Sequence, residues 1–298
     1  MEFTILPARM EIEALEDIHL PAGAETNIFR GAFGMALRNV SCAPECAGVR
    51  ECPLDRKCAY ARVFEPVWDG GPSGYQDPPR PFVLRMAGQR GKVLAGERVQ
   101  AGLFLFDTRM AGERDAWTEL ARAFDVAAAG GLGPSRGRAR LRVFERGWVG
   151  EPLGGESILL PVRSAEGLGR IRVEFATPTE LKHKGEVRNE PEFAAVANRL
   201  AERVWTLGRL YQGWSSDWDY RDLLDLSPMV RLVDWKWDRT DPMRRSSRTY
   251  QIHSIGGFTG WAEYEGPVGA FRALLEIGRW TGVGRQTVWG KGEIRVVG

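Results

Sequence analysis

Residues 170–178 read Arg-Ile-Arg-Val-Glu-Phe-Ala-Thr-Pro. Apolar Ile171, Val173 and Phe175 alternate here with charged residues, a pattern typical of a strand with one buried face. A looser alternation begins the chain at residues 2–14. After each of these two strands the sequence predicts the same series: a helix, two strands, a second helix and a last strand. The order β-α-β-β-α-β therefore occurs twice.

The two halves differ in detail. In the first half we expect a helix that is N-capped by Thr26, and its apolar side consists of Phe29, Phe33, Leu37 and Val40. Strands near 81–88 and 97–107 and a helix over 111–129 follow. The last strand starts at 138 and places Arg138, Arg140 and Arg142 on one face. In the second half we expect a helix near 190–212, strands near 229–238 and 247–264, a helix starting at Pro267, and a last strand over 287–297.

This element order predicts an α+β protein with two tandem ferredoxin-like (RRM-like) domains, 1–150 and 151–298. The first domain carries a cysteine-containing loop at 41–65. The second carries a glycine-rich loop at 282–292, which follows a helix and enters a strand, so it is not a phosphate-binding P-loop.

Composition sets limits on function. The 298 residues include 41 Lys and Arg against 39 Asp and Glu, a net charge of +2, so an anionic partner must be bound by local basic patches. No apolar run approaches the ~18 residues that a membrane span needs, and the N-terminus resembles no secretion signal. We therefore expect a cytoplasmic protein without membrane association.

All four cysteines, Cys42, Cys46, Cys52 and Cys58, fall within one short segment with the spacing C-x3-C-x5-C-x5-C. In a reducing compartment this clustering indicates a structural metal site, because tetrahedral zinc takes four soft ligands. The spacing is irregular, so an iron–sulfur cluster, two disulfides or unliganded thiols stay open as alternatives. A site with four protein ligands has no open position for catalysis.

The C-terminal region contains Gly256-Gly-Phe-Thr-Gly-Trp-Ala-Glu-Tyr-Glu-Gly, an expected helix, and then Gly282-Val-Gly-Arg-Gln-Thr-Val-Trp-Gly-Lys-Gly. This ending resembles that of the RAMP-superfamily CRISPR-associated endoribonucleases that process precursor crRNA. Segments similar to motifs of one branch of that family are Phe29-Arg-Gly-Ala-Phe-Gly-Met-Ala-Leu-Arg, Cys58-Ala-Tyr-Ala-Arg-Val-Phe-Glu and Thr177-Pro-Thr-Glu-Leu-Lys-His-Lys-Gly. The resemblance implies two ferredoxin-like domains, a CRISPR repeat hairpin as ligand, and subunits of a CRISPR effector complex as partners.

The resemblance also implies a metal-independent reaction that uses no cofactor. The ribose 2′-OH upstream of the cut attacks the phosphate and leaves a 2′,3′-cyclic phosphate and a 5′-OH. Such chemistry needs a base, an acid and cations near the reacting phosphate. Many members place a histidine in or just after the first helix, and this chain has none there. Its three histidines are His19, His183 and His253.

Two groups are candidates for the reaction. Arg30, Gly34 and Arg38 share one side of the first helix, so a glycine gap between two guanidiniums could seat a phosphate. Arginine stays protonated and would stabilise charge rather than abstract a proton. His183 lies between Lys182 and Lys184, whose charges are expected to depress its pKa and favour a phosphate contact. Solvated or ion-paired surface residues are the alternative in both cases.

RNA contacts are expected from basic segments with aromatic neighbours, because guanidiniums hold phosphates while rings stack on unpaired bases. The residues are Lys182, Lys184, Arg244, Arg245, Arg248, Tyr250, Arg285 and Lys291. By contrast, Trp214, Trp218, Trp235 and Trp237 are expected in the core or in interfaces.

The sequence thus predicts an endoribonuclease that cleaves CRISPR repeat RNA and stays bound to its product hairpin. The alternative is a non-catalytic RAMP-type subunit that holds crRNA in an effector complex. A zinc-stabilised protein-interaction module is a third hypothesis.

Overall fold

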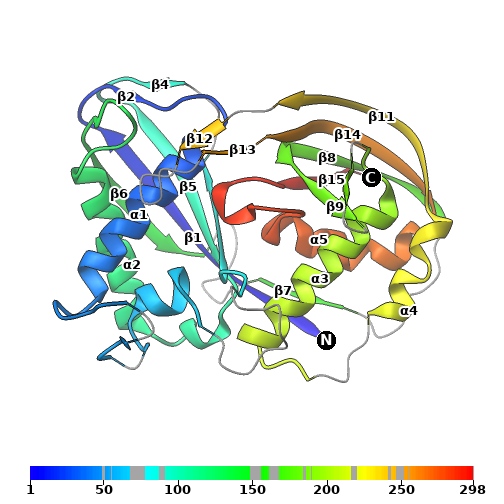
Figure 1. Ribbon diagram of the computed structural model, residues 1–298, viewed down its shortest axis with the longest axis horizontal. Coiled ribbons are helices and arrows are strands. Elements are labelled where there is room, and N and C mark those ends of the chain that lie inside the picture. The colour runs from blue at the N-terminus through cyan, green and yellow to red at the C-terminus, as the bar shows by residue number, and fades with distance from the viewer. Residues whose placement is uncertain are drawn as a thin grey trace. The chain divides into compact units, whose positions relative to one another are not determined.

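The structure is a computed structural model (Figure 1), and it describes residues 1–48, 51–54, 56–67, 78–86, 91–147, 156–160, 168–183, 186–188, 190–215, 220–240, 243–245, 252–254 and 256–297. The chain divides into two compact units. We call Ile5–Glu156 the N-terminal unit, and Met1–Thr4 with Ser157–Gly298 the C-terminal unit. The boundary expected at 150/151 falls outside the described residues.

The N-terminal unit contains one main antiparallel sheet. Its elements are β1 (Glu2–Ala14), α1 (Glu25–Ser41), β3 (Phe82–Met86), β5 (Arg98–Leu105), α2 (Arg114–Ala129) and β6 (Ala139–Arg146). The strands lie in the order β3-β5-β1-β6. Smaller elements are β2 (Ile18–His19), paired with β4 (Lys92–Val93), and a 3-10 turn at Thr108–Met110. This topology confirms the predicted ferredoxin-like fold.

Aromatic side chains hold α1 and α2 together. The rings of Phe33 and Phe124 stack with centroids 4.0 Å apart, and Phe29 stacks on Phe124 at 5.4 Å. One detail of α1 differs from the sequence prediction: the helix begins at Glu25, and its N-cap residue is Ala24, which makes no side-chain cap bond. Thr26 therefore lies inside the first turn rather than capping it.

The cysteine loop returns to this core through a π-helical turn, Tyr60–Phe64. Phe64 packs against Phe33 and Phe82, with ring centroids 6.0 and 5.7 Å away. Arg62 lies 3.7 Å from the fully buried carboxylate of Asp107. The end of the loop is thus part of the N-terminal core.

The C-terminal unit repeats the topology. Its elements are β8 (Gly169–Thr179), α3 (Phe193–Tyr211), β11 (Arg231–Thr240), β14 (Gly257–Gly266), α5 (Arg272–Thr281) and β15 (Ile294–Val297). The antiparallel order is β11-β14-β8-β15, which is the same permutation of chain order as in the N-terminal unit. Smaller elements are β7 (Glu156–Leu159), β9 (Leu181–His183), β10 (Glu186–Arg188), α4 (Arg221–Leu224), a 3-10 turn at Ser227–Met229, β12 (Met243–Arg245) and β13 (Ile252–Ser254).

Two predicted boundaries in this unit are wrong. The helix expected at Pro267 starts as a 3-10 turn, Val268–Phe271, and becomes α-helical only at Arg272. The last strand begins at Ile294, because Thr287–Trp289 form another 3-10 turn inside the glycine-rich loop. Within the described residues, no helix has the length and apolar character needed to cross a bilayer.

Tyr264 lies at the centre of the C-terminal core, fully buried. Its hydroxyl donates a hydrogen bond to the Pro191 carbonyl at 2.6 Å, and its ring packs edge-on against Phe193 at 5.0 Å. The start of the chain also belongs here: the Trp214 indole donates to the Glu2 carbonyl at 3.0 Å. Trp214 therefore has the structural role that the sequence predicted.

Candidate nucleic-acid interface

The glycine-rich loop connects α5 to β15 and closes on itself. Gly282, Gly284, Gly290 and Gly292 have φ values between 71° and 84°, in the left-handed region that favours glycine. The Val283 amide donates to the Gly292 carbonyl at 2.8 Å, and a Cβ on Gly292 would lie 2.0 Å from the Val283 carbonyl oxygen. A side chain at Gly292 would therefore prevent the loop from closing.

The loop is fixed to the segment that follows β8. The Gly292 amide donates to the Pro178 carbonyl at 3.1 Å, and the Arg285 amide donates to the Glu180 carbonyl at 3.2 Å. A Cβ on Gly284 would lie 2.4 Å from that same Glu180 oxygen. Because β9 begins one residue after Glu180, the structure brings the glycine-rich loop beside the strand that contains Lys182 and His183.

Lys291 and Arg285 have different roles in this loop. Lys291 is only 5% exposed, and its Nζ donates to the Gly256 carbonyl at 2.6 Å and to Gln286 Oε1 at 2.9 Å. The sequence assigned Lys291 to RNA, but its ammonium instead ties the loop to the start of β14. The Arg285 side chain is 58% exposed and pairs with Glu180 Oε1 at 2.7 Å. Arg285 is thus accessible to an anionic ligand.

A hairpin extension leaves from the same place. β12 pairs with β13, with Arg244 opposite His253 and Arg245 opposite Ile252. Gly257, the first residue of β14, lies against the backbone of Thr179, where a Cβ would be 2.5 Å from the carbonyl oxygen.

Three segments therefore converge on residues 177–181: the glycine-rich loop, the β9–β10 pair and the base of the β12–β13 hairpin (Figure 1). We call this region the basic junction. Cationic residues that lie far apart in the sequence are thus on neighbouring segments, an arrangement that suits an RNA backbone. The side chains of Lys182, His183, Arg244 and Arg245, and all of Lys184, Arg248 and Tyr250, lie outside the described residues, so their roles stay predictions.

The prediction that a gap at Gly34 on α1 binds a phosphate is wrong, because that gap is filled. The ring of Phe64 fills the gap at Gly34, where a Cβ would lie 2.1 Å from the ring, and the Arg30 guanidinium stacks 4.2 Å from the centre of that ring. Arg30 therefore covers an aromatic side chain. Arg38 is exposed, so its proposed contact with RNA stays a prediction. The aromatic run that follows Cys58 was the signal that could have indicated this packing.

The four cysteines are free thiols in one neighbourhood. Cys42 follows the end of α1, and its thiol lies near those of Cys46 and Cys58. Burial, together with these neighbouring thiols, raises the pKa of Cys42 to about 12, and burial also raises the pKa of Cys58. Within the described part of the chain, no group of three or more His, Cys, Asp or Glu side chains is arranged to hold a metal ion. The metal site therefore stays a prediction.

Two ferredoxin-like units with a glycine-rich loop after the last helix define a RAMP-type protein. Residues 173–294 match the family model described as CRISPR-associated endoribonuclease Cas6, and residues 3–163 match a second model, AF_1859_N, described as an N-terminal domain. The C-terminal part of the chain, residues 173–294, is therefore a domain of the CRISPR-associated endoribonuclease Cas6 family. No curated protein matches it at a significant level.

Solved structures agree on the fold. A product complex of the Thermus thermophilus Cas6 TTHB231 matches with a TM-score of 0.59 and 18% identity, over 98% of this chain and 100% of that one. A product complex of the Cas6 TTHA0078 matches with a TM-score of 0.55 and 19% identity, over 99% and 100%. A chain of a partial Cas6-RT-Cas1–Cas2 complex matches with a TM-score of 0.57 and 10% identity, over 99% of this chain and 46% of that one.

Proposed function

We propose that this chain cleaves CRISPR repeat RNA without a metal ion and keeps the product hairpin bound. The observation that carries this proposal is the basic junction, where hydrogen bonds hold the glycine-rich loop against residues 177–181. Family membership supports endoribonuclease chemistry on CRISPR RNA. The loop that carries the exposed Arg285 is already folded before RNA arrives, which lowers the ordering cost of binding.

The proposed reaction needs no activated water. The 2′-OH of the nucleotide before the cut attacks the adjacent phosphorus, the P–O5′ bond breaks, and the proton lost by the 2′-OH is balanced by one delivered to the 5′ oxygen. The products are a 2′,3′-cyclic phosphate and a 5′-OH. We propose His183, at the end of β9, as the group that moves a proton, and Arg285 as a cation that stabilises the phosphorane.

Cleavage of a repeat hairpin in EDTA tests this function. We expect cleavage to continue in EDTA and to stop when only the nucleotide before the cut carries 2′-deoxyribose, because the nucleophile is then missing while the phosphates remain. The control is the same deoxy substitution one nucleotide away, which should still be cut. Cleavage of the first substrate would overturn the mechanism.

One observation favours a second candidate function, a non-catalytic subunit that holds crRNA. Helix α1, Glu25–Ser41, contains no histidine. In that case the unmutated chain would bind repeat hairpins tightly and cleave none of them. We propose assembly with other CRISPR proteins under either function; the name of the Cas6-RT-Cas1–Cas2 complex describes such an assembly for a related fold.

We also propose that the four cysteines hold one structural metal ion, zinc before an iron–sulfur cluster. Four soft donors lie in a single loop whose C-terminal end is packed into the N-terminal core. Elemental analysis of protein purified without added metal should find about one equivalent. Substoichiometric zinc and iron, together with four thiols that titrate freely in the native protein, would exclude the metal site. The Cys46→Ser variant should lose the metal.

A further inference from the structure

Two tryptophans on β11 form an uncovered stacked pair. The rings of Trp235 and Trp237 lie 5.7 Å apart between centroids, with an interplanar angle of 18°. Trp235 is 43% exposed, which is unusual for so large an apolar side chain, and Trp237 is partly exposed. The sequence analysis expected both in the core or an interface, so this exposure needs its own explanation.

The strand register places these rings on the same face of the sheet as the buried Ala262, at the edge of that face. Directly paired residues of antiparallel strands point to the same face of a sheet. Trp235 is opposite Ala262 and Trp237 is opposite Gly260. A Cβ on Gly260 would lie 2.1 Å from the Lys236 carbonyl oxygen, so no larger residue fits there. Among the strands that the structure describes, β11 is the edge strand of its sheet (Figure 1), so no strand in the described part of the chain lies beside it on that side.

The same face of β11 continues toward the basic junction. Arg239 is two residues beyond Trp237, is exposed, and is opposite Phe258 in the ladder. β12, with Arg244 and Arg245, follows immediately along the hairpin. Acidic Asp234 and Asp238 alternate with the tryptophans and therefore belong to the other face. The stretch from the tryptophan pair to the β12–β13 hairpin thus combines aromatic rings with positively charged residues. Single-stranded RNA binds to surfaces with this combination.

We propose that Trp235 and Trp237 form a stacking platform for an unpaired base in the single-stranded RNA next to the repeat hairpin. This inference rests on the proposed function, because it names a further part of the same RNA ligand. A base stacks on the outer face of a ring, since the two rings are already in contact with each other. Every base has a flat face, so the platform favours single strands over duplex without selecting a sequence. A protein partner is the competing occupant, but the adjacent arginines favour an anionic strand.

The experiment compares two RNAs: the repeat hairpin with its single-stranded flanks, and the same hairpin cut back to its base pairs. For Trp235→Ala/Trp237→Ala we expect affinity for the flanked RNA to fall about tenfold or more, and affinity for the bare hairpin to stay unchanged. Trp235→Phe/Trp237→Phe should restore most of the loss, because phenyl rings also stack.

Trp261→Leu is the matched control. Trp261 lies on the opposite face of β14, where the Arg172 guanidinium stacks 4.1 Å from its ring, and its loss should not change the preference for flanked RNA. The platform would be overturned if the double alanine variant lost the same affinity for both RNAs, or if its affinity for both RNAs were unchanged. It would also be overturned if the unmutated protein bound both RNAs equally well. Failure of the unmutated protein to bind either RNA would instead overturn the proposed function. Thermal unfolding of each variant separates lost binding from lost folding.

Discussion

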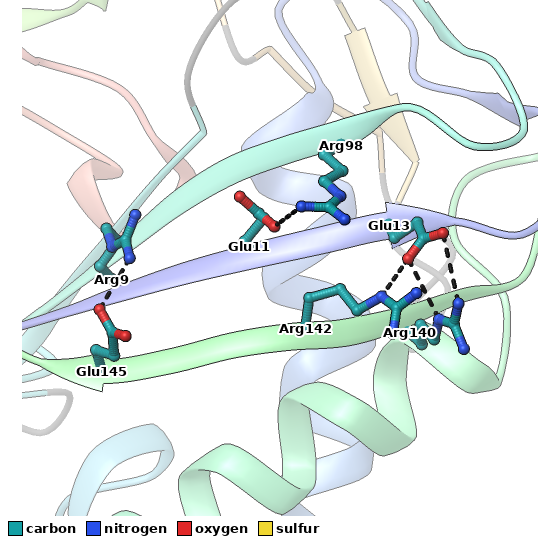
Figure 2. Close-up of polar contacts among 7 residues, drawn as sticks. All are labelled: Arg9, Glu11, Glu13, Arg98, Arg140, Arg142 and Glu145. Carbon is teal, nitrogen blue, oxygen red and sulfur yellow. Dashed lines mark hydrogen bonds and ion pairs between the residues drawn. The ribbon is translucent and has the colours of Figure 1, made fainter.

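The two units share one topology and use their charged residues differently. In the N-terminal unit, arginines and glutamates of three neighbouring strands neutralise one another across the sheet (Figure 2): Arg9 pairs with Glu145, Arg98 with Glu11, and both Arg140 and Arg142 with Glu13. The hydrogen bonds from Arg142 and Arg140 lower the pKa of Glu13 to about 2. Each of these arginines has a carboxylate partner on a neighbouring strand, so much of the charge on this face of the sheet is neutralised.

The sheet of the C-terminal unit has a similar ladder, in which Arg170 and Arg172 pair with Glu263 and Glu265. The difference lies outside the sheet, in the glycine-rich loop, the strand pair β9–β10 and the hairpin β12–β13. These additions form the basic junction, and the N-terminal unit has the cysteine loop instead. The comparison teaches that the same topology occurs in both units, while the connections between its elements give each unit its own features.

The largest expected effect is on the rate of cleavage, to which residues of the two units are expected to contribute differently. His183→Ala should slow single-turnover cleavage by about 100-fold or more, which is the usual cost of removing a proton-transferring group. Arg38→Ala in the N-terminal unit should slow it less, because a guanidinium can stabilise charge but cannot accept the proton.

His253→Ala is the control for His183, since it removes a histidine from the neighbouring hairpin. A collapse of the rate in Arg38→Ala, with His183→Ala near normal, would move the chemistry to the N-terminal unit and reverse the comparison.

The next largest expected effect is a difference between the two units in how much their arginines contribute to RNA affinity. Arg244→Ala/Arg245→Ala should weaken binding and reduce the slope of log affinity against log salt by about 1.5, because two phosphate contacts release fewer counterions. The matched variant, Arg140→Ala/Arg142→Ala, removes the same charge from the N-terminal sheet and should leave the slope unchanged. Equal slopes for the two double variants in a titration from low to moderate salt would mean that the N-terminal sheet also contacts RNA.

Local sequence patterns were sufficient to predict the fold, but they were not sufficient to predict how the residues of the candidate site are arranged. Alternation in residues 2–14 and 170–178 predicted both first strands, and the element order predicted the topology that the structure confirms. Contacts between distant segments were not predictable in this way. The return of Phe64 to Gly34 and the burial of Lys291 under Gly256 depend on how loops close, which no periodic pattern records.

The packing of Phe64 gives a stability prediction confined to the N-terminal unit. Gly34→Ala should destabilise folding by roughly 1–3 kcal/mol, because the Phe64 ring is held between Phe33 and Phe82 and cannot move aside. Gly31→Ala in the same helix meets nothing within 4 Å and should stabilise by up to about 1 kcal/mol. Urea unfolding of both variants measures the contrast, and equal midpoints would show that the ring does not occupy the gap.

The smallest expected effect concerns the ion pairs of the N-terminal sheet. The pKa of Glu13 is about 2 in the folded protein against 4.5 for the free group, so its ionised form is favoured by folding. A lowered pKa contributes stability above the unfolded value, and this contribution is lost as the pH falls from about 4.5 toward 2. Glu13→Gln should therefore be slightly less stable than the unmutated protein at pH 7, and the difference should shrink as the pH falls toward 2. Because these side chains are near solvent, the difference at pH 7 should also shrink in high salt. A difference in the urea midpoint that did not shrink between pH 7 and pH 2.5 would show that Glu13 acts through packing rather than through charge, and the arginines opposite it would then be available to other anions.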